Sequence, residues 1–197
     1  MRDDKIEESI KVYKKPDLFF KEALEKASKN QHLVISEEAQ AYVLGILISV
    51  VKHRPEDKQR KEGMLTEKYM VALVGEHHDL FRAVGDSSLV VAGIWWQSLI
   101  RKIVDVNHYI EIGSRSYQGA SHTGPEILYD LFDELADNFK KIVNVLAEVT
   151  ACVYGSKLSN SDVLKMYEVW LQTHNTFLAD KLKELGINVV PGTVMKQ

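Results

Sequence analysis

Residues 125–149 decide the fold, and they read PEILYDLFDELADNFKKIVNVLAEV. Apolar side chains recur at steps of three and four residues from Leu128 to Val149, which is the period of one face of an α-helix. The pattern begins at Pro125 and ends near Gly155, the placement of proline and glycine that helices favour. The charged positions on the opposite face are Asp130, Asp133, Asp137, Lys140 and Lys141. We therefore predict one long amphipathic helix here.

Similar patterns predict helices along the rest of the chain. Pro16 begins a helix that ends near Asn30, and Ser36 is the N-cap of a strongly apolar helix that extends through Val51. Further helices are predicted from Thr66 onward, from Asp105 to Tyr117, and from Ser159 or Asn160 to Gly186. A loop is predicted over residues 119–124, which begin and end with glycine.

Two apolar stretches lie between these elements. The helix that begins at Thr66 is expected to pack through Tyr69, Met70, Leu73 and Val74. The run from Leu89 to Trp96 is almost continuously apolar, and periodicity alone does not separate a buried strand from a buried helix there. Because no partner strands or hairpin turns occur elsewhere in the sequence, we predict that this run is helical.

The predicted fold class is all-α, a single-domain multi-helix bundle of six to eight helices over residues 1–197. Residues 1–15 are expected to form a loosely attached segment and residues 187–197 an extended tail. Leu135 and Phe139 are expected in the core. A chain of 197 residues with 45% apolar residues buries a sizeable core without a metal or disulfide, and its one cysteine excludes an intrachain disulfide.

Charge and hydropathy exclude two classes of function. The net charge of −3 predicts no nucleic-acid binding, since such proteins carry a basic footprint. The longest uncharged run, Ser87 to Ile100, has 14 residues, whereas a membrane span needs about 20. Because no apolar segment follows the charged N-terminus, we predict no signal peptide and a cytoplasmic location.

One pair of residues suggests a metal site. His78-Asp79 resembles the centre of HD-domain phosphohydrolases, which are all-α and bind a divalent metal. That resemblance implies His53 as the upstream ligand and Asp105 or Asp130 as the last. The flanking residues depart from the family pattern, and a polar helix face is the favoured interpretation. No cofactor is predicted outside this alternative, and no catalytic residue is identified.

A second group of candidates lies between residues 86 and 117. Aromatic residues beside Arg and Asp either line a pocket or a partner groove, or fill a core with hydrogen-bonded polar tips. The candidates are Asp86, Trp95, Trp96, Arg101, Tyr109, Arg115 and Tyr117.

Several short strings carry a family resemblance. They include Val84-Gly85-Asp86-Ser87-Ser88-Leu89, Leu131-Phe132-Asp133-Glu134-Leu135 and Tyr167-Glu168-Val169-Trp170-Leu171. From about Ser36 onward the sequence resembles an uncharacterised bacterial family of all-helical proteins of about this length. The resemblance implies a one-domain fold and no known activity.

The expected function is a non-enzymatic helical module that binds a protein partner or itself, for example as a homodimer. It is favoured because amphipathic helices are abundant and no complete catalytic set is present. Two alternatives stay open. One is the metal-dependent phosphohydrolase centred on His78 and Asp79, and the other is a small-ligand-binding bundle that uses Trp95, Trp96 and Tyr117.

Overall fold

The computed structural model describes residues 16–52, 62–96, 106–154, 160–174 and 176–189. In these ranges the chain forms nine α-helices, one π-helix and one 3₁₀-helix, and no strand. The predicted all-α class is confirmed, while the number of helices exceeds the predicted six to eight. The segment 1–15, most of the tail, His53, Arg101, Asp105 and the basic loop before residue 62 lie outside the described residues.

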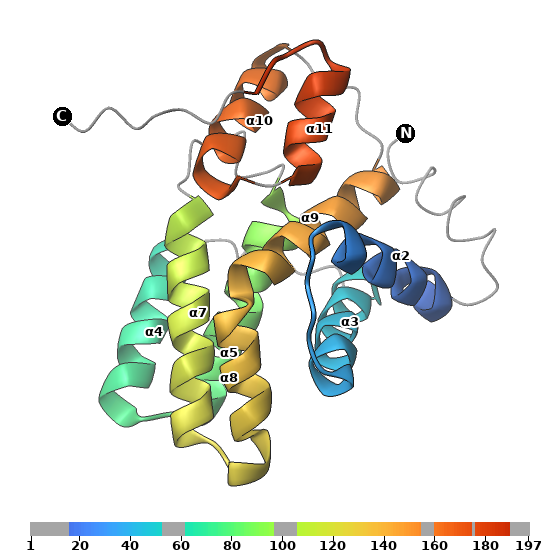
Figure 1. Cartoon of the computed structure of the whole chain (residues 1–197). Helices are drawn as coiled ribbons and strands as arrows, with labels where there is room; N and C mark the ends of the chain where they lie inside the picture. Colours follow the sequence, from blue (N-terminus) through green and yellow to red (C-terminus); the bar gives the residue numbers. More distant parts are fainter. Residues whose placement is uncertain (1–15, 53–61, 97–105, 155–159, 175, 190–197) are drawn as a thin grey trace.

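The helices pack into one helical body (Figure 1). α7 lies against both α5 and α8, α4 lies against α5, and α9 packs on α2 and on η2. In chain order the elements are α2 (Pro16–Asn30), α3 (Glu37–Lys52), α4 (Glu62–Gly75), α5 (His78–Leu89), η2 (Val90–Ile94), α7 (Val106–Thr123), η3 (Glu126–Leu128), α8 (Tyr129–Asp137), α9 (Phe139–Tyr154), α10 (Asn160–Thr173) and α11 (Thr176–Glu184).

The start of α3 is the predicted one. The Ser36 hydroxyl oxygen accepts a hydrogen bond from the Ala39 backbone N–H at 3.1 Å, which is the geometry of an N-cap. The Ser36 backbone N–H and hydroxyl also donate to the Glu134 carboxylate, at 2.8 and 2.5 Å. The cap therefore also ties the start of α3 to α8.

The long helix predicted over residues 125–149 is wrong in one respect, because it is broken at Asn138. That residue has φ −98° and ψ 8°, and its side-chain amide donates to the Glu134 carbonyl at 3.0 Å. Asparagine competes for backbone groups in this way and favours turns. The apolar stripe continues across the break, so the periodicity gave no sign of it. α8 packs on α7, whereas α9 packs mainly on α2 and η2.

The predicted last helix is also two helices, α10 and α11, which separate at His174 with its left-handed φ of 52°. The predicted end at Gly186 is confirmed. Gly186 has φ 81°, and the Ile187 N–H donates to the Leu182 carbonyl at 2.9 Å, which is a Schellman motif.

The apolar run from Leu89 to Trp96 is helical as predicted, but most of it is a π-helix. The Trp95 backbone N–H donates to the Val90 carbonyl, five residues back, at 2.9 Å. Gly93 lies so close to α9 that an added Cβ would stand 2.8 Å from the Cβ of Leu146. Close backbone approach of this kind requires glycine.

Two smaller predictions are wrong. Residues 119–123 belong to α7 and are not a loop, since the ring of Phe81 packs directly over Gly119 and stabilises the helix there. In α4 the core side is formed by Leu65 and Ala72, so most of the side chains predicted to be packed point outward. Among the described helices, none combines the length and apolarity needed to cross a membrane.

The predicted core residues Leu135 and Phe139 are buried, with 0% and 1% of their surface exposed. We expect Leu135→Ala to lower the free energy of unfolding by about 2–5 kcal/mol, because it removes buried methyl groups and leaves a cavity. Urea denaturation measures this, and Leu164→Ala is the matched control because Leu164 is largely exposed. Equal losses in both variants would contradict the assignment of Leu135 to the core.

Candidate functional site

A single carboxylate oxygen joins three helices. Oδ1 of Asp86 on α5 accepts hydrogen bonds from the hydroxyl groups of Tyr42 on α3, at 2.7 Å, and Tyr117 on α7, at 2.8 Å. The sequence predicted Asp86 and Tyr117 as candidates, and the structure brings them together. We call Asp86, Tyr42 and Tyr117 the polar joint.

Aromatic rings surround the polar joint. The ring of Phe132 lies 5.6 Å from those of Tyr42 and Tyr117, and the ring of Phe139 lies 5.5 Å from that of Tyr117. Gly85 makes room for this group, because an added Cβ would stand 2.5 Å from the Tyr117 ring. Edge-to-face and tilted contacts of this kind add to the stabilisation that burial alone provides.

Arg82 closes the polar joint on the solvent side. Its Nε lies 3.9 Å from Oδ2 of Asp86, and its guanidinium lies over the Tyr42 ring, 5.9 Å from the centroid. Arg82 was not predicted, although it lies four residues before Asp86 on the same helix, a spacing at which side chains meet. Tyr42 had no comparable signal in the sequence, because it is one residue of an apolar helix far along the chain.

Burial shifts the pKa values of this group. It raises the pKa of the Asp86 carboxyl, while the hydrogen bonds from the two phenols and the charge of Arg82 act in the opposite direction. Burial, followed by the Asp86 charge, raises the pKa of Tyr117 well above its ordinary value, and the same causes raise that of Tyr42. Both phenols therefore stay protonated and act as donors near neutral pH. With both phenols on Oδ1, the arrangement serves as a structural joint between helices.

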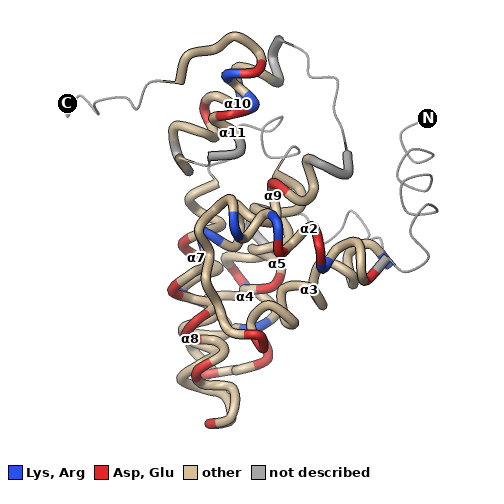
Figure 2. The backbone as a smooth tube through the Cα atoms, turned by 45° about the vertical axis from the view of Figure 1, so that its right-hand side comes forward, with Lys and Arg blue, Asp and Glu red and all other residues tan. Residues whose placement is uncertain are grey.

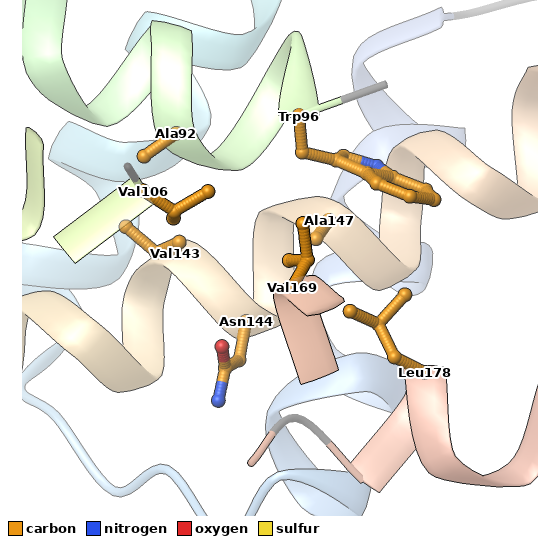
Figure 3. Close-up of a pocket in the computed structure, with 8 residues that line it drawn as sticks. All are labelled: Ala92, Trp96, Val106, Val143, Asn144, Ala147, Val169 and Leu178. Atoms are coloured by element: carbon orange, nitrogen blue, oxygen red, sulfur yellow. The ribbon is translucent and has the colours of Figure 1, made fainter. Parts of the chain in front are cut away.

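The other predicted pocket residues lie elsewhere. Trp96 is buried in the wall of a small cavity (Figure 3), Tyr109 is also buried, and Trp95 is half-buried. Arg115 is exposed, and within the described ranges the basic residue paired with Asp86 is Arg82. The sequence grouped these residues because they are close along the chain, but helical geometry distributes them over several faces.

The predicted metal ligands are only partly within the described residues. The Nδ1 atom of His78 lies 2.8 Å from the Ala120 carbonyl oxygen, and its ring packs on Phe132. Asp79 and Asp130 are exposed. Within the described ranges, no three His, Cys, Asp or Glu side chains come close enough to hold a metal ion. The metal-dependent alternative stays a prediction.

An apolar surface on α4 was not predicted. Met70, Val71, Leu73 and Val74 expose 54%, 55%, 46% and 87% of their surface. At 100° per residue these four positions cover one continuous side of the last turn and a half of α4, opposite the buried Leu65 and Ala72. We call these four residues the outer face of α4.

Charged residues are distributed over many elements. Figure 2 shows Lys and Arg positions interleaved with Asp and Glu positions along the described chain. On α4, Glu67 lies beside the outer face, because it precedes Met70 and Val71 by three and four residues. Lys68 lies on the other side, four residues before the buried Ala72. Both charged side chains are exposed.

Comparison with known proteins leaves the chain without an assigned family. No family model, no curated protein and no solved structure matches it significantly. The sequence and structure support an all-helical protein of 197 residues, and the bacterial family suggested by the short strings is not identified.

The polar joint predicts a pH dependence. The pKa of Asp86 is higher in the folded state than in the unfolded state, so protonation of this carboxyl favours folding. This stabilisation is complete below the unfolded-state pKa of about 3.9. It is lost as the pH rises through the folded-state pKa. Asp86→Asn keeps an acceptor for both phenols and does not titrate. We therefore expect the variant to gain stability relative to the wild type as the pH rises from about 4 to 7.

Urea denaturation at several pH values measures this difference. As a contrast, Asp86→Ala removes the acceptor of the buried Tyr117 hydroxyl and of the half-buried Tyr42 hydroxyl, and it should lower the free energy of unfolding by roughly 2 kcal/mol. If the wild type instead became more stable relative to Asp86→Asn as the pH rises, the direction of the Asp86 pKa shift would be wrong.

Proposed function

We propose that the chain is a non-enzymatic helical module that associates with a second copy of itself through the outer face of α4. The observation that carries this proposal is that the last turn and a half of α4 is apolar on both sides although the helix lies at the edge of the helical body (Figure 1). A helix that is apolar all round is normally buried on all sides. We therefore expect another protein surface to cover the exposed side chains of the outer face of α4.

The charge beside the outer face favours an antiparallel pair. Glu67 lies on the same side of α4 as this face, three and four residues before Met70 and Val71. A parallel two-fold pair would place Glu67 on Glu67, which is unfavourable. An antiparallel pair separates these two carboxylates to opposite ends of the contact.

The size of the outer face sets the expected strength. Four side chains exposed to this extent offer roughly 400 Å² per copy, within the range of apolar patches that mark interaction sites. This is about half of what one partner contributes to a standard interface. A dimer held by this face alone is therefore expected to be weak, with dissociation in the micromolar range or above.

Val74→Asp tests the proposal, since Val74 is the most exposed residue of the outer face and its substitution leaves the core intact. We expect wild-type protein to shift from monomer to dimer between about 10 and 500 µM, and the variant to dissociate at least tenfold more readily, because dimerisation would bury its charge. Sedimentation velocity measures both. The matched control is Ile127→Asp, which changes an 89% exposed residue in η3 and should behave as wild type.

A wild-type protein that stays monomeric over the whole concentration range would overturn the proposed self-association. A dimer that Val74→Asp leaves unchanged would show that it forms through another surface.

A further inference from the structure

The outer face of α4 has a methionine at its centre. Met70 and Val74 are one helical turn apart and form the middle of this face, while Val71 and Leu73 lie on either side of them. Met70 exposes 54% of its surface, so dissolved molecules reach its side chain in the single chain. An accessible thioether therefore lies within the contact that we have proposed.

A second methionine gives the contrast. Met166 of α10 exposes 2% of its surface and is packed in the core. A thioether reacts with an oxidant only where the oxidant reaches the sulfur atom, so burial protects Met166 and exposure leaves Met70 reactive. Among the methionines whose side chains the structure describes, oxidation is therefore directed to the outer face of α4.

The reaction is a two-electron oxidation by hydrogen peroxide. A lone pair of the Met70 sulfur attacks one peroxide oxygen, so that an S–O bond forms and the O–O bond breaks. The sulfur loses two electrons and the peroxide gains them. The departing hydroxide takes the proton that remains on the transferred oxygen and leaves as water. The product, methionine sulfoxide, carries a polar S–O group in place of an apolar thioether.

The outer face of α4 offers this new oxygen no hydrogen-bond donor. The side chains of Val71, Leu73 and Val74 have none, and the Glu67 carboxylate beside Met70 is itself an acceptor. In a two-fold pair the opposing face consists of the same residues and brings no donor either. Burying the sulfoxide in the pair therefore costs free energy, whereas in the monomer water solvates its oxygen.

We propose that Met70 is an oxidation site through which hydrogen peroxide controls the self-association of the chain. The inference rests on the proposed function, because it requires the outer face of α4 to be the contact. The thioether packs between the two copies, and the sulfoxide separates them. Methionine sulfoxide reductases convert the sulfoxide back to the thioether, so the change is reversible.

Peroxide treatment of the full chain, followed by sedimentation velocity, tests the proposal. Peptide mass spectrometry measures oxidation at each methionine, and we expect Met70 to react roughly tenfold faster than Met166. We expect protein oxidised at Met70 to dissociate about tenfold more readily than untreated protein, because its dimer buries an unpaired oxygen. Treatment with methionine sulfoxide reductase should restore both the original mass and the dimer.

Met70→Leu is the matched control, because leucine has a similar size and no sulfur. This variant should dimerise as the wild type does and keep its dimer after peroxide treatment. The cysteine and the other methionines of the chain receive the same treatment in this variant, so they serve as internal controls. Met70→Gln places an uncharged polar group at the same position and should weaken the dimer without peroxide.

The outcomes separate this inference from the proposed function. A wild-type dimer that survives complete oxidation of Met70 would overturn the inference and leave the self-association intact. A Met70→Leu dimer that peroxide dissociates equally would also overturn it, because another residue would then be the site. Loss of the helical circular dichroism signal on oxidation would overturn it as well, since the dimer would be lost through unfolding. A wild-type chain that is monomeric at every concentration would overturn the proposed function, and this inference with it.

Discussion

The hydrogen bonds to Oδ1 of Asp86 are the interaction on which the described structure most depends. Two phenols from α3 and α7 meet on one oxygen of α5, so three helices far apart in the chain share one contact point. Hydrophobic packing alone tolerates many arrangements of similar volume, whereas a partly buried carboxylate is most stable where its donors are in place. The geometry thus favours one arrangement of these helices over its near alternatives.

Glutamates play a related part at two helix ends. Glu134 of α8 receives the Ser36 cap of α3. Glu148 of α9 receives the side-chain amides of Asn30 and Gln31 at the end of α2, at 2.5 and 2.9 Å. In both cases a carboxylate from the central helices fixes where a peripheral helix begins or ends. Both carboxylates therefore have hydrogen-bond partners on the helix ends that they hold.

The parts of the fold that the sequence predicted are those with a local cause. Ser36 and Gly186 determine helix ends through bonds within a few residues, and the burial of Leu135 follows from its place in the stripe. The break at Asn138 was missed because the apolar period continues across it. The outward side of α4 was missed because apolar residues on both sides of a helix leave its orientation undetermined. Tyr42 joins Asp86 only through tertiary packing, so no spacing in the sequence reveals it.

Helix ends with a left-handed residue have a consequence for how this protein tolerates change. α2, α4 and α11 all end in the same backbone motif, with Leu33, His77 and Ile187 donating to carbonyls five residues back. The left-handed position is glycine only in the last, and His32 and Glu76 occupy it in the first two. Each of these adopts a conformation that costs an ordinary residue about 1 kcal/mol. A change to glycine at either of these two surface positions would remove that cost and stabilise the fold. The added stability would offset part of the loss from a damaging core substitution, so the fold would accept a wider range of sequences.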